Sequence, residues 1–126
     1  INEARRYRKM AGGAMRQAGF LAAAGLYALE NHVERLHEDH DNARLLAEEL
    51  AELNGLWVDL DKVQSNMVFA NVTADGLNAV EYGGRLKERG VLVNAMSGEY
   101  FRAVTHLGIE REDILAAVEV FAESLE

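Results

Sequence analysis

The basic residues near the N-terminus are the first candidates for chemistry. Residues 1–16 hold five of the thirteen Lys and Arg residues and one acidic residue, a net charge of +4. The whole chain carries −8, so the remaining 110 residues carry −12. Lys9 and Arg16 stand on either side of Gly12-Gly13, where the backbone can approach a ligand closely. Cations around a glycine turn at a helix start could hold a phosphate; the alternative is a solvated basic helix with a glycine break.

Arg102 is the second candidate. It alternates with the apolar residues Phe101 and Ala103, as a side chain on one face of a strand would. The planar fork of its guanidinium suits a carboxylate. The alternative is a surface arginine on an edge strand.

Two histidines near the middle of the chain invite a metal interpretation. His37 and Asp41 are four residues apart, which places them on one helical face. His40 falls on an apolar stripe, so we interpret it as a partly buried histidine held by hydrogen bonds, and we predict no metal site.

Hydrophobic periodicity predicts the elements that must position these residues. Helices are expected over residues 2–10, 14–30, 31–53 and 77–89 and from residue 110, with Asn2 and Asn31 as N-caps. Strands are expected over residues 57–60, 67–72, 91–94 and 100–106. The buried stripe of the third helix is expected to consist of Val33, Leu36, His40, Ala43, Ala47 and Leu50, and that of the last helix of Ile114, Leu115, Val118 and Phe121. The order of elements predicts an α+β fold: N-terminal helices lead into a small antiparallel or mixed sheet of about four short strands, covered by helices on one side.

Composition limits the class of protein. A chain of 126 residues with 49% hydrophobic residues can bury one core. No cysteine and no apolar run of membrane-spanning length occur, so we expect a cytoplasmic protein that binds no membrane. The absence of an extended basic stripe argues against nucleic acid. The chain opens on Ile1 and lacks proline, where average usage predicts roughly six, and we interpret it as a piece of a longer chain.

Three stretches of the sequence resemble the low-specificity L-threonine aldolases, and they occur in the order of that family. They are Arg8-Lys9-Met10-Ala11-Gly12-Gly13-Ala14-Met15-Arg16-Gln17 with the following Ala22 to Leu29, then Glu38 to Ala43, and finally Arg102-Ala103-Val104-Thr105-His106-Leu107. The resemblance spans nearly the whole chain but only the C-terminal third of such an enzyme. It implies an aminotransferase-like small domain of a fold-type I pyridoxal-phosphate enzyme, with residues 1–30 as a helical link from the large domain and residues 31–126 as the small domain.

The resemblance also implies a function. The parent enzyme would cleave L-threonine or L-allo-threonine to glycine and acetaldehyde as a homotetramer. Arg102 would contact the α-carboxylate of the amino-acid substrate, and Lys9 and Arg16 would lie near the cofactor phosphate. His106 would orient a loop, and Asn94 and Met96 would line the cleft.

The lysine that binds pyridoxal phosphate lies upstream in the family, so the 126-residue chain alone is expected to be inactive. Two alternatives stay open. One is a non-catalytic oligomerisation module, and the other is the small domain of a different fold-type I enzyme.

Overall fold

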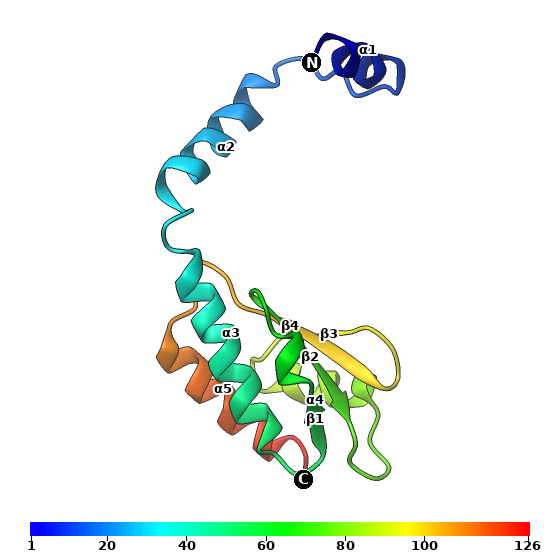
Figure 1. The fold of residues 1–126 in the computed structure, drawn as a ribbon. Coiled ribbons are helices and arrows are strands. Elements are labelled where there is room, and N and C mark those ends of the chain that lie inside the picture. The colour runs from blue at the N-terminus through cyan, green and yellow to red at the C-terminus, as the bar shows by residue number, and fades with distance from the viewer. The chain divides into compact units, whose positions relative to one another are not determined.

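The computed structural model describes all 126 residues and divides them into two compact units, Ile1–Arg35 and Leu36–Glu126 (Figure 1). The predicted boundary after residue 30 concerns the domains of a longer protein and stays a prediction. None of the helices is both long enough and apolar enough to cross a membrane.

The first unit consists of two helices, α1 (Asn2–Met10) and α2 (Gly19–Asn31), and no residue of either helix is buried. The predicted glycine break is confirmed. Gly12 has a φ of +78°, and the Gly13 N–H donates to the Arg8 carbonyl oxygen at 2.8 Å. A Cβ at Gly13 would lie 3.0 Å from that same oxygen, so this turn requires a residue without a side chain.

The second unit is a four-stranded sheet with three helices. The strands are β1 (Leu56–Val58), β2 (Met67–Val72), β3 (Asn94–Ala95) and β4 (Tyr100–Val104), in the spatial order β1-β2-β4-β3, and every pair is antiparallel. The helices are α3 (Leu36–Ala51), α4 (Ala79–Glu88) and α5 (Arg111–Glu123), and a 3-10 turn, η1 (Leu60–Lys62), follows β1. Helices α3 and α5 lie side by side, and α3 and α4 pack on the sheet (Figure 1). The predicted α+β class with helices on one side of the sheet is confirmed.

The core lies between the sheet and the helices. Strands β2 and β4 alternate buried and exposed residues, and Val68, Ala70 and Phe101 point inward. The Phe101 ring lies 5.8 Å from that of Tyr82 in α4 and 5.7 Å from that of Phe121 in α5. The three aromatic rings therefore join both helices to the central strand pair.

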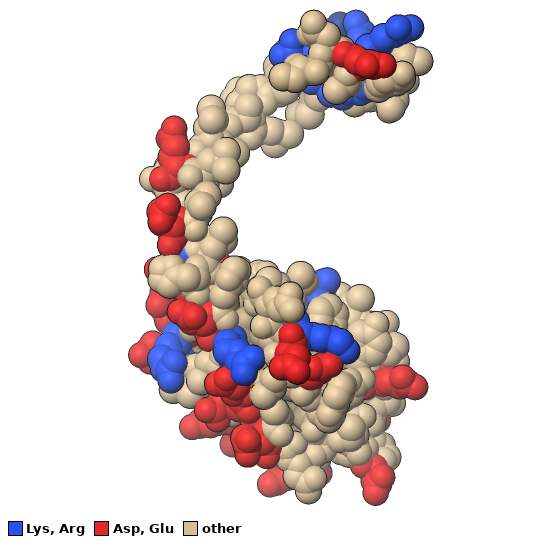
Figure 2. Space-filling model, viewed as in Figure 1, with Lys and Arg blue, Asp and Glu red and all other residues tan.

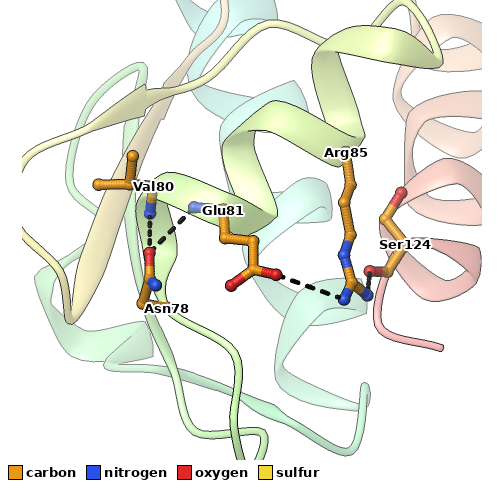
Figure 3. Close-up of polar contacts among 5 residues, drawn as sticks. All are labelled: Asn78, Val80, Glu81, Arg85 and Ser124. Carbon is orange, nitrogen blue, oxygen red and sulfur yellow. Dashed lines mark hydrogen bonds and ion pairs between the residues drawn. The ribbon is translucent and has the colours of Figure 1, made fainter.

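Helix α4 is fixed at both ends by polar contacts (Figure 3). The Asn78 side-chain oxygen accepts hydrogen bonds from the N–H groups of Val80 and Glu81, each at 3.0 Å, which satisfies two donors of the first turn. Arg85 donates to the Ser124 carbonyl oxygen at 3.1 Å at the end of α5. Helix α4 is thus tied to α5 near the C-terminus.

The predicted start of the third helix is wrong. Asn31 is the last residue of α2, and its side-chain amide donates back to the Tyr27 carbonyl oxygen at 2.8 Å. Helix α3 begins five residues later, at Leu36. Asn2 is not an N-cap either, because it is the first residue of α1 and Ile1 occupies the N-cap position. Helix α2 begins at Gly19 rather than near residue 14, after Gln17 adopts a φ of +52° that a helix cannot include.

The predicted buried stripe of the third helix is wrong near the start of the helix, where the buried position is shifted by one residue. His40 is exposed, and Asp39 is buried in its place at 6% exposure. The prediction took its phase from Val33, which precedes the helix and is exposed. The buried positions of α3 are Asp39, Ala43, Leu46, Ala47 and Leu50. Leu115 of α5 is likewise exposed, at 43%, so it does not belong to the inner face.

The third predicted strand is also wrong over most of its length, because β3 contains only Asn94 and Ala95. Gly90, with a φ of +90°, ends the preceding helix, and the Val91 N–H donates to the Leu86 carbonyl oxygen at 3.0 Å. That donor belongs to the helix end, so Val91 cannot begin a sheet ladder.

Candidate functional site

The face of the sheet that points away from the helices carries Arg102. Because Phe101 and Ala103 are buried in the core, Arg102 between them points to the opposite face. Its register partners are Phe69 in β2 and Asn94 in β3. Met67 and Phe69 are 38% and 45% exposed on this face, so Arg102 stands among accessible apolar side chains.

The guanidinium of Arg102 combines burial with unused hydrogen-bonding capacity. The residue as a whole is half-buried, and its Nε atom is buried without a hydrogen-bond partner. A buried donor without a partner is costly unless a ligand or a rearranged side chain satisfies it. The arrangement therefore suits an anion that a planar fork of N–H donors can bind, such as a carboxylate.

The chain that follows β4 is held firmly. Thr105, which is 2% exposed, donates from Oγ1 to the Asp39 carbonyl oxygen of α3 at 2.6 Å. Asn66 accepts from the Thr105 N–H at 3.0 Å through its carbonyl oxygen, and its side-chain amide donates to the Thr105 carbonyl oxygen at 2.7 Å. Asn42 donates to the Ile109 carbonyl oxygen at 2.9 Å. These contacts fix the end of the strand that carries Arg102.

Sequence reasoning missed the parts played by Asn42 and Asn66. Both are separated in sequence by 39 residues or more from the residues that they bind. The only sequence signal was the threonine that follows Arg102 by three positions. His106 is exposed, with Nδ1 lying 2.9 Å from the Leu107 carbonyl oxygen, so its contact is local to the loop.

Lys9 and Arg16 belong to the first unit, where both are exposed. Figure 2 shows the basic side chains gathered on α1. Lys9 lies in the last turn of α1, and Arg16 lies in the turn that leads into α2. The two cations thus stand on either side of the glycine turn, and their charges are accessible to a phosphate.

Asn94 and Met96 lie together at the edge of the sheet. The Asn94 side-chain amide donates to the Met96 sulfur at 3.5 Å. Asn94 is the direct partner of Arg102 in the antiparallel pair of β3 and β4. Both residues are exposed, so they are accessible on the same edge as the arginine.

A small hollow on the same sheet face holds one of the three lysines. It is lined by Trp57, Asp59, Lys62, Val63, Met67, Phe69 and Asn71. The Lys62 ammonium lies 2.8 Å from the Asp59 carboxylate. Their hydrogen bond raises the pKa of Lys62 and lowers that of Asp59. The Asp59 carboxylate holds the Lys62 ammonium in an ion pair, which does not suit a lysine that must act as a nucleophile.

No metal centre emerges from the cluster around His37. The structure contains no group of three or more His, Cys, Asp or Glu side chains that could hold a metal ion.

The fold of this chain is similar to that of known proteins. Among solved structures, the chain is similar to a glutamate decarboxylase from Lactobacillus brevis, with a TM-score of 0.58, 19% identity, and coverage of 71% of this chain and 22% of that one. It is also similar to ornithine delta-aminotransferase from Plasmodium falciparum, with a TM-score of 0.57, 18% identity, and coverage of 73% and 24%. The fold is that of the small domain of fold-type I pyridoxal-phosphate enzymes.

Sequence comparison assigns the chain to a narrower group than the fold does. Residues 1–73 match a family model described as beta-eliminating lyase, and the chain belongs to this family. The family and the fold indicate pyridoxal phosphate as the cofactor, as the resemblance implied.

The relatives of this chain include low-specificity L-threonine aldolases. The protein from Escherichia coli strain K12 is 48% identical over 114 residues, which is 90% of this chain and 32% of that relative. Low-specificity L-threonine aldolase 1 of Arabidopsis thaliana is 35% identical over 127 residues, covering 99% of this chain and 35% of the relative. The chain therefore spans about a third of the length of these relatives.

Proposed function

We propose that this chain is the C-terminal part of a pyridoxal-phosphate-dependent aldolase that cleaves L-threonine or L-allo-threonine to glycine and acetaldehyde. The observation that carries this proposal is Arg102, a half-buried arginine on an open sheet face with a buried and unpartnered Nε. The choice of threonine rests on the 48% identity to the aldolase of Escherichia coli. The fold alone does not select the reaction, because a decarboxylase and an aminotransferase share it.

In this proposal Arg102 binds the α-carboxylate of the substrate. Two parallel N–H donors of a guanidinium match the two oxygens of a carboxylate, and this fixes the orientation of the amino acid as well as its charge. The contacts of Thr105 with Asp39 and Asn66 hold β4 in place, so the arginine starts from a defined position. Preorganisation of this kind reduces the cost of binding.

Lys9 and Arg16 hold the cofactor phosphate in this proposal. Their donors fit a phosphate, which carries close to two negative charges at neutral pH. Pyridoxal phosphate, when bound, supplies the electron sink for cleavage of the bond between Cα and Cβ. The residues of this chain contribute binding and orientation.

The lysine that binds the cofactor would lie outside this chain. Of the three lysines present, Lys9 is assigned to the phosphate and Lys62 is paired with Asp59. Lys87 lies exposed on α4. We therefore expect the 126-residue chain alone to cleave no threonine.

The remaining parts of the proposal concern the whole protein. We infer a cytoplasmic homotetramer that acts in glycine metabolism, with residues 1–30 as the link from a large domain and residues 31–126 as the small domain. Every residue of α1 and α2 is exposed, and their apolar side chains need a covering surface, which supports the assembly and the link.

The test is the variant Arg102→Lys in the full-length protein loaded with cofactor. Lysine keeps the charge but cannot form the two parallel hydrogen bonds. Because a hydrogen bond to a charged group contributes about 1.5–3 kcal/mol, we expect the KM for L-threonine to rise roughly 10- to 150-fold.

Arg44→Lys is the matched control. Arg44 is an exposed arginine of α3 that binds Glu48 at 2.6 Å and the Leu60 carbonyl oxygen at 2.9 Å, and its replacement should leave the KM unchanged. An unchanged KM and turnover in Arg102→Lys would rule out the carboxylate role of Arg102.

A further inference from the structure

Asn94 faces Arg102 directly across the edge of the sheet. Strand β3 has only two residues, and its register pairs Asn94 with Arg102 and Ala95 with Phe101. Since Phe101 points into the core, the Asn94–Arg102 pair lies on the open face. Side chains in such directly opposed positions have Cβ atoms roughly 4.5–5.5 Å apart, which is within reach of a hydrogen bond between an amide and a guanidinium.

The hydrogen-bond needs of the two side chains are complementary. Arg102 has a buried Nε–H without an acceptor, and its other cross-strand neighbour, Phe69, has no acceptor in its side chain. Asn94 donates from Nδ2 to the Met96 sulfur at 3.5 Å, and its Oδ1 accepts no hydrogen bond. The amide oxygen of Asn94 is therefore a suitable acceptor for the Nε–H of Arg102.

We propose that Asn94 is a positioning residue for Arg102. Its Oδ1 would accept a hydrogen bond from the Arg102 Nε–H, a bond that the structure itself does not contain, while its Nδ2 keeps the contact with Met96. The guanidinium is then held at Nε, and its two terminal nitrogens are left to bind a carboxylate end-on. This inference rests on the proposed carboxylate role of Arg102.

The physical benefit of Asn94 is a reduced loss of entropy on binding. A free arginine side chain samples several rotamers, and a carboxylate must select one of them. If the Nε atom is already held, fewer rotamers are lost when the ligand binds, so the entropy cost of binding is smaller. The effect of Asn94 should therefore appear only for ligands that carry a carboxylate.

The experiment uses the full-length protein loaded with cofactor and two variants. Asn94→Leu removes the acceptor and keeps the volume of the side chain, and Asn94→Ala removes both. Two competitive ligands are compared. 3-Hydroxybutyrate is threonine without its amino group, and 1-amino-2-propanol is threonine without its carboxylate. Asn71→Leu is the control, because Asn71 lies on the neighbouring strand opposite Tyr100 rather than Arg102.

We expect the inhibition constant of 3-hydroxybutyrate to rise roughly 3- to 10-fold in both Asn94 variants, the usual effect of one lost hydrogen bond. The constant of 1-amino-2-propanol should change less than about twofold, within the range of substitutions that touch no ligand. In an Arg102→Lys background, Asn94→Leu should have no further effect, because the two residues act as one unit.

Equal changes for both ligands, or additive effects of the Asn94 and Arg102 substitutions, would overturn the positioning role and leave the carboxylate role of Arg102 intact. If Arg102→Lys itself leaves the 3-hydroxybutyrate constant unchanged, the carboxylate role fails, and the positioning role falls with it.

Discussion

Tyr82 shows how a single polar atom is accommodated in this core. The residue is fully buried, and its hydroxyl donates to the Phe121 carbonyl oxygen at 2.7 Å. That carbonyl lies near the end of α5, where backbone acceptors lack helical partners. Burial raises the pKa of Tyr82 because the phenolate would be desolvated.

The raised pKa predicts an alkaline loss of stability. The folded state keeps Tyr82 protonated, while in the unfolded chain the phenol ionises near pH 10. The contribution of Tyr82 to the free energy of unfolding is therefore complete below about pH 10 and declines as the pH rises above it. The Tyr82→Phe variant should unfold more easily by about 1 kcal/mol at pH 8. Between pH 9 and about pH 11 it should lose less stability than the parent chain.

Urea unfolding followed by the fluorescence of the single tryptophan, Trp57, measures this difference. Tyr7→Phe is the control, since Tyr7 is 59% exposed and lies in the first unit. Parallel pH profiles for Tyr82→Phe and the parent chain would contradict the prediction.

At the scale of elements, α4 contains two adjacent glycines that differ in their surroundings. A Cβ at Gly83 would meet the Val93 side chain at 3.6 Å, whereas a Cβ at Gly84 would meet nothing within 4 Å. Neither glycine has a positive φ. Gly84 therefore adds flexibility to the unfolded chain without any packing benefit in the helix.

Gly84→Ala should stabilise the chain by about 0.5–1 kcal/mol, because alanine loses less backbone entropy in a helix. Gly90→Ala provides the opposite control, since Gly90 has a φ of +90° and alanine there would be strained. Urea midpoints and far-ultraviolet circular dichroism report both changes. A Gly84→Ala variant that unfolds at lower urea than the parent would show that this position is constrained in a way that the helix does not reveal.

At the scale of the whole molecule, burial is confined to one unit. Every buried residue lies in Leu36–Glu126, and Ile1–Arg35 contributes none. In α2, Phe20 is 83% exposed and Leu29 is 68% exposed. A 13-residue helix without packing partners is marginal in water, so α2 requires another surface for its stability.

Removal of residues 1–31, all of which are exposed, should therefore leave the core unchanged. We expect the free energy of unfolding of residues 32–126 to match that of the 126-residue chain within about 0.5 kcal/mol, the usual range for changes away from packed groups. Urea unfolding of both chains under the same conditions checks this. A loss above about 1 kcal/mol would mean that the first unit stabilises the core.

Local patterns in the sequence determined much of this fold. The β-branched and aromatic residues of Met67–Val72 predicted β2 with its observed bounds, because such side chains fit the pleated surface of a sheet. Gly12-Gly13 and Gly90 ended helices as expected, since a positive φ is a local requirement that glycine meets at low cost. The resemblance also led to the family to which the chain belongs.

Only the tertiary structure decided which positions face each other. The buried side of α3 includes Asp39 rather than His40, because packing against the sheet sets the rotation of a helix and its period alone does not. The strand order β1-β2-β4-β3 places β2 beside β4, whose paired residues, such as Phe69 and Arg102, lie far apart in sequence. The pairing of Asn94 with Arg102 depends on the register between β3 and β4: the sequence supplied both residues, and the register placed them side by side.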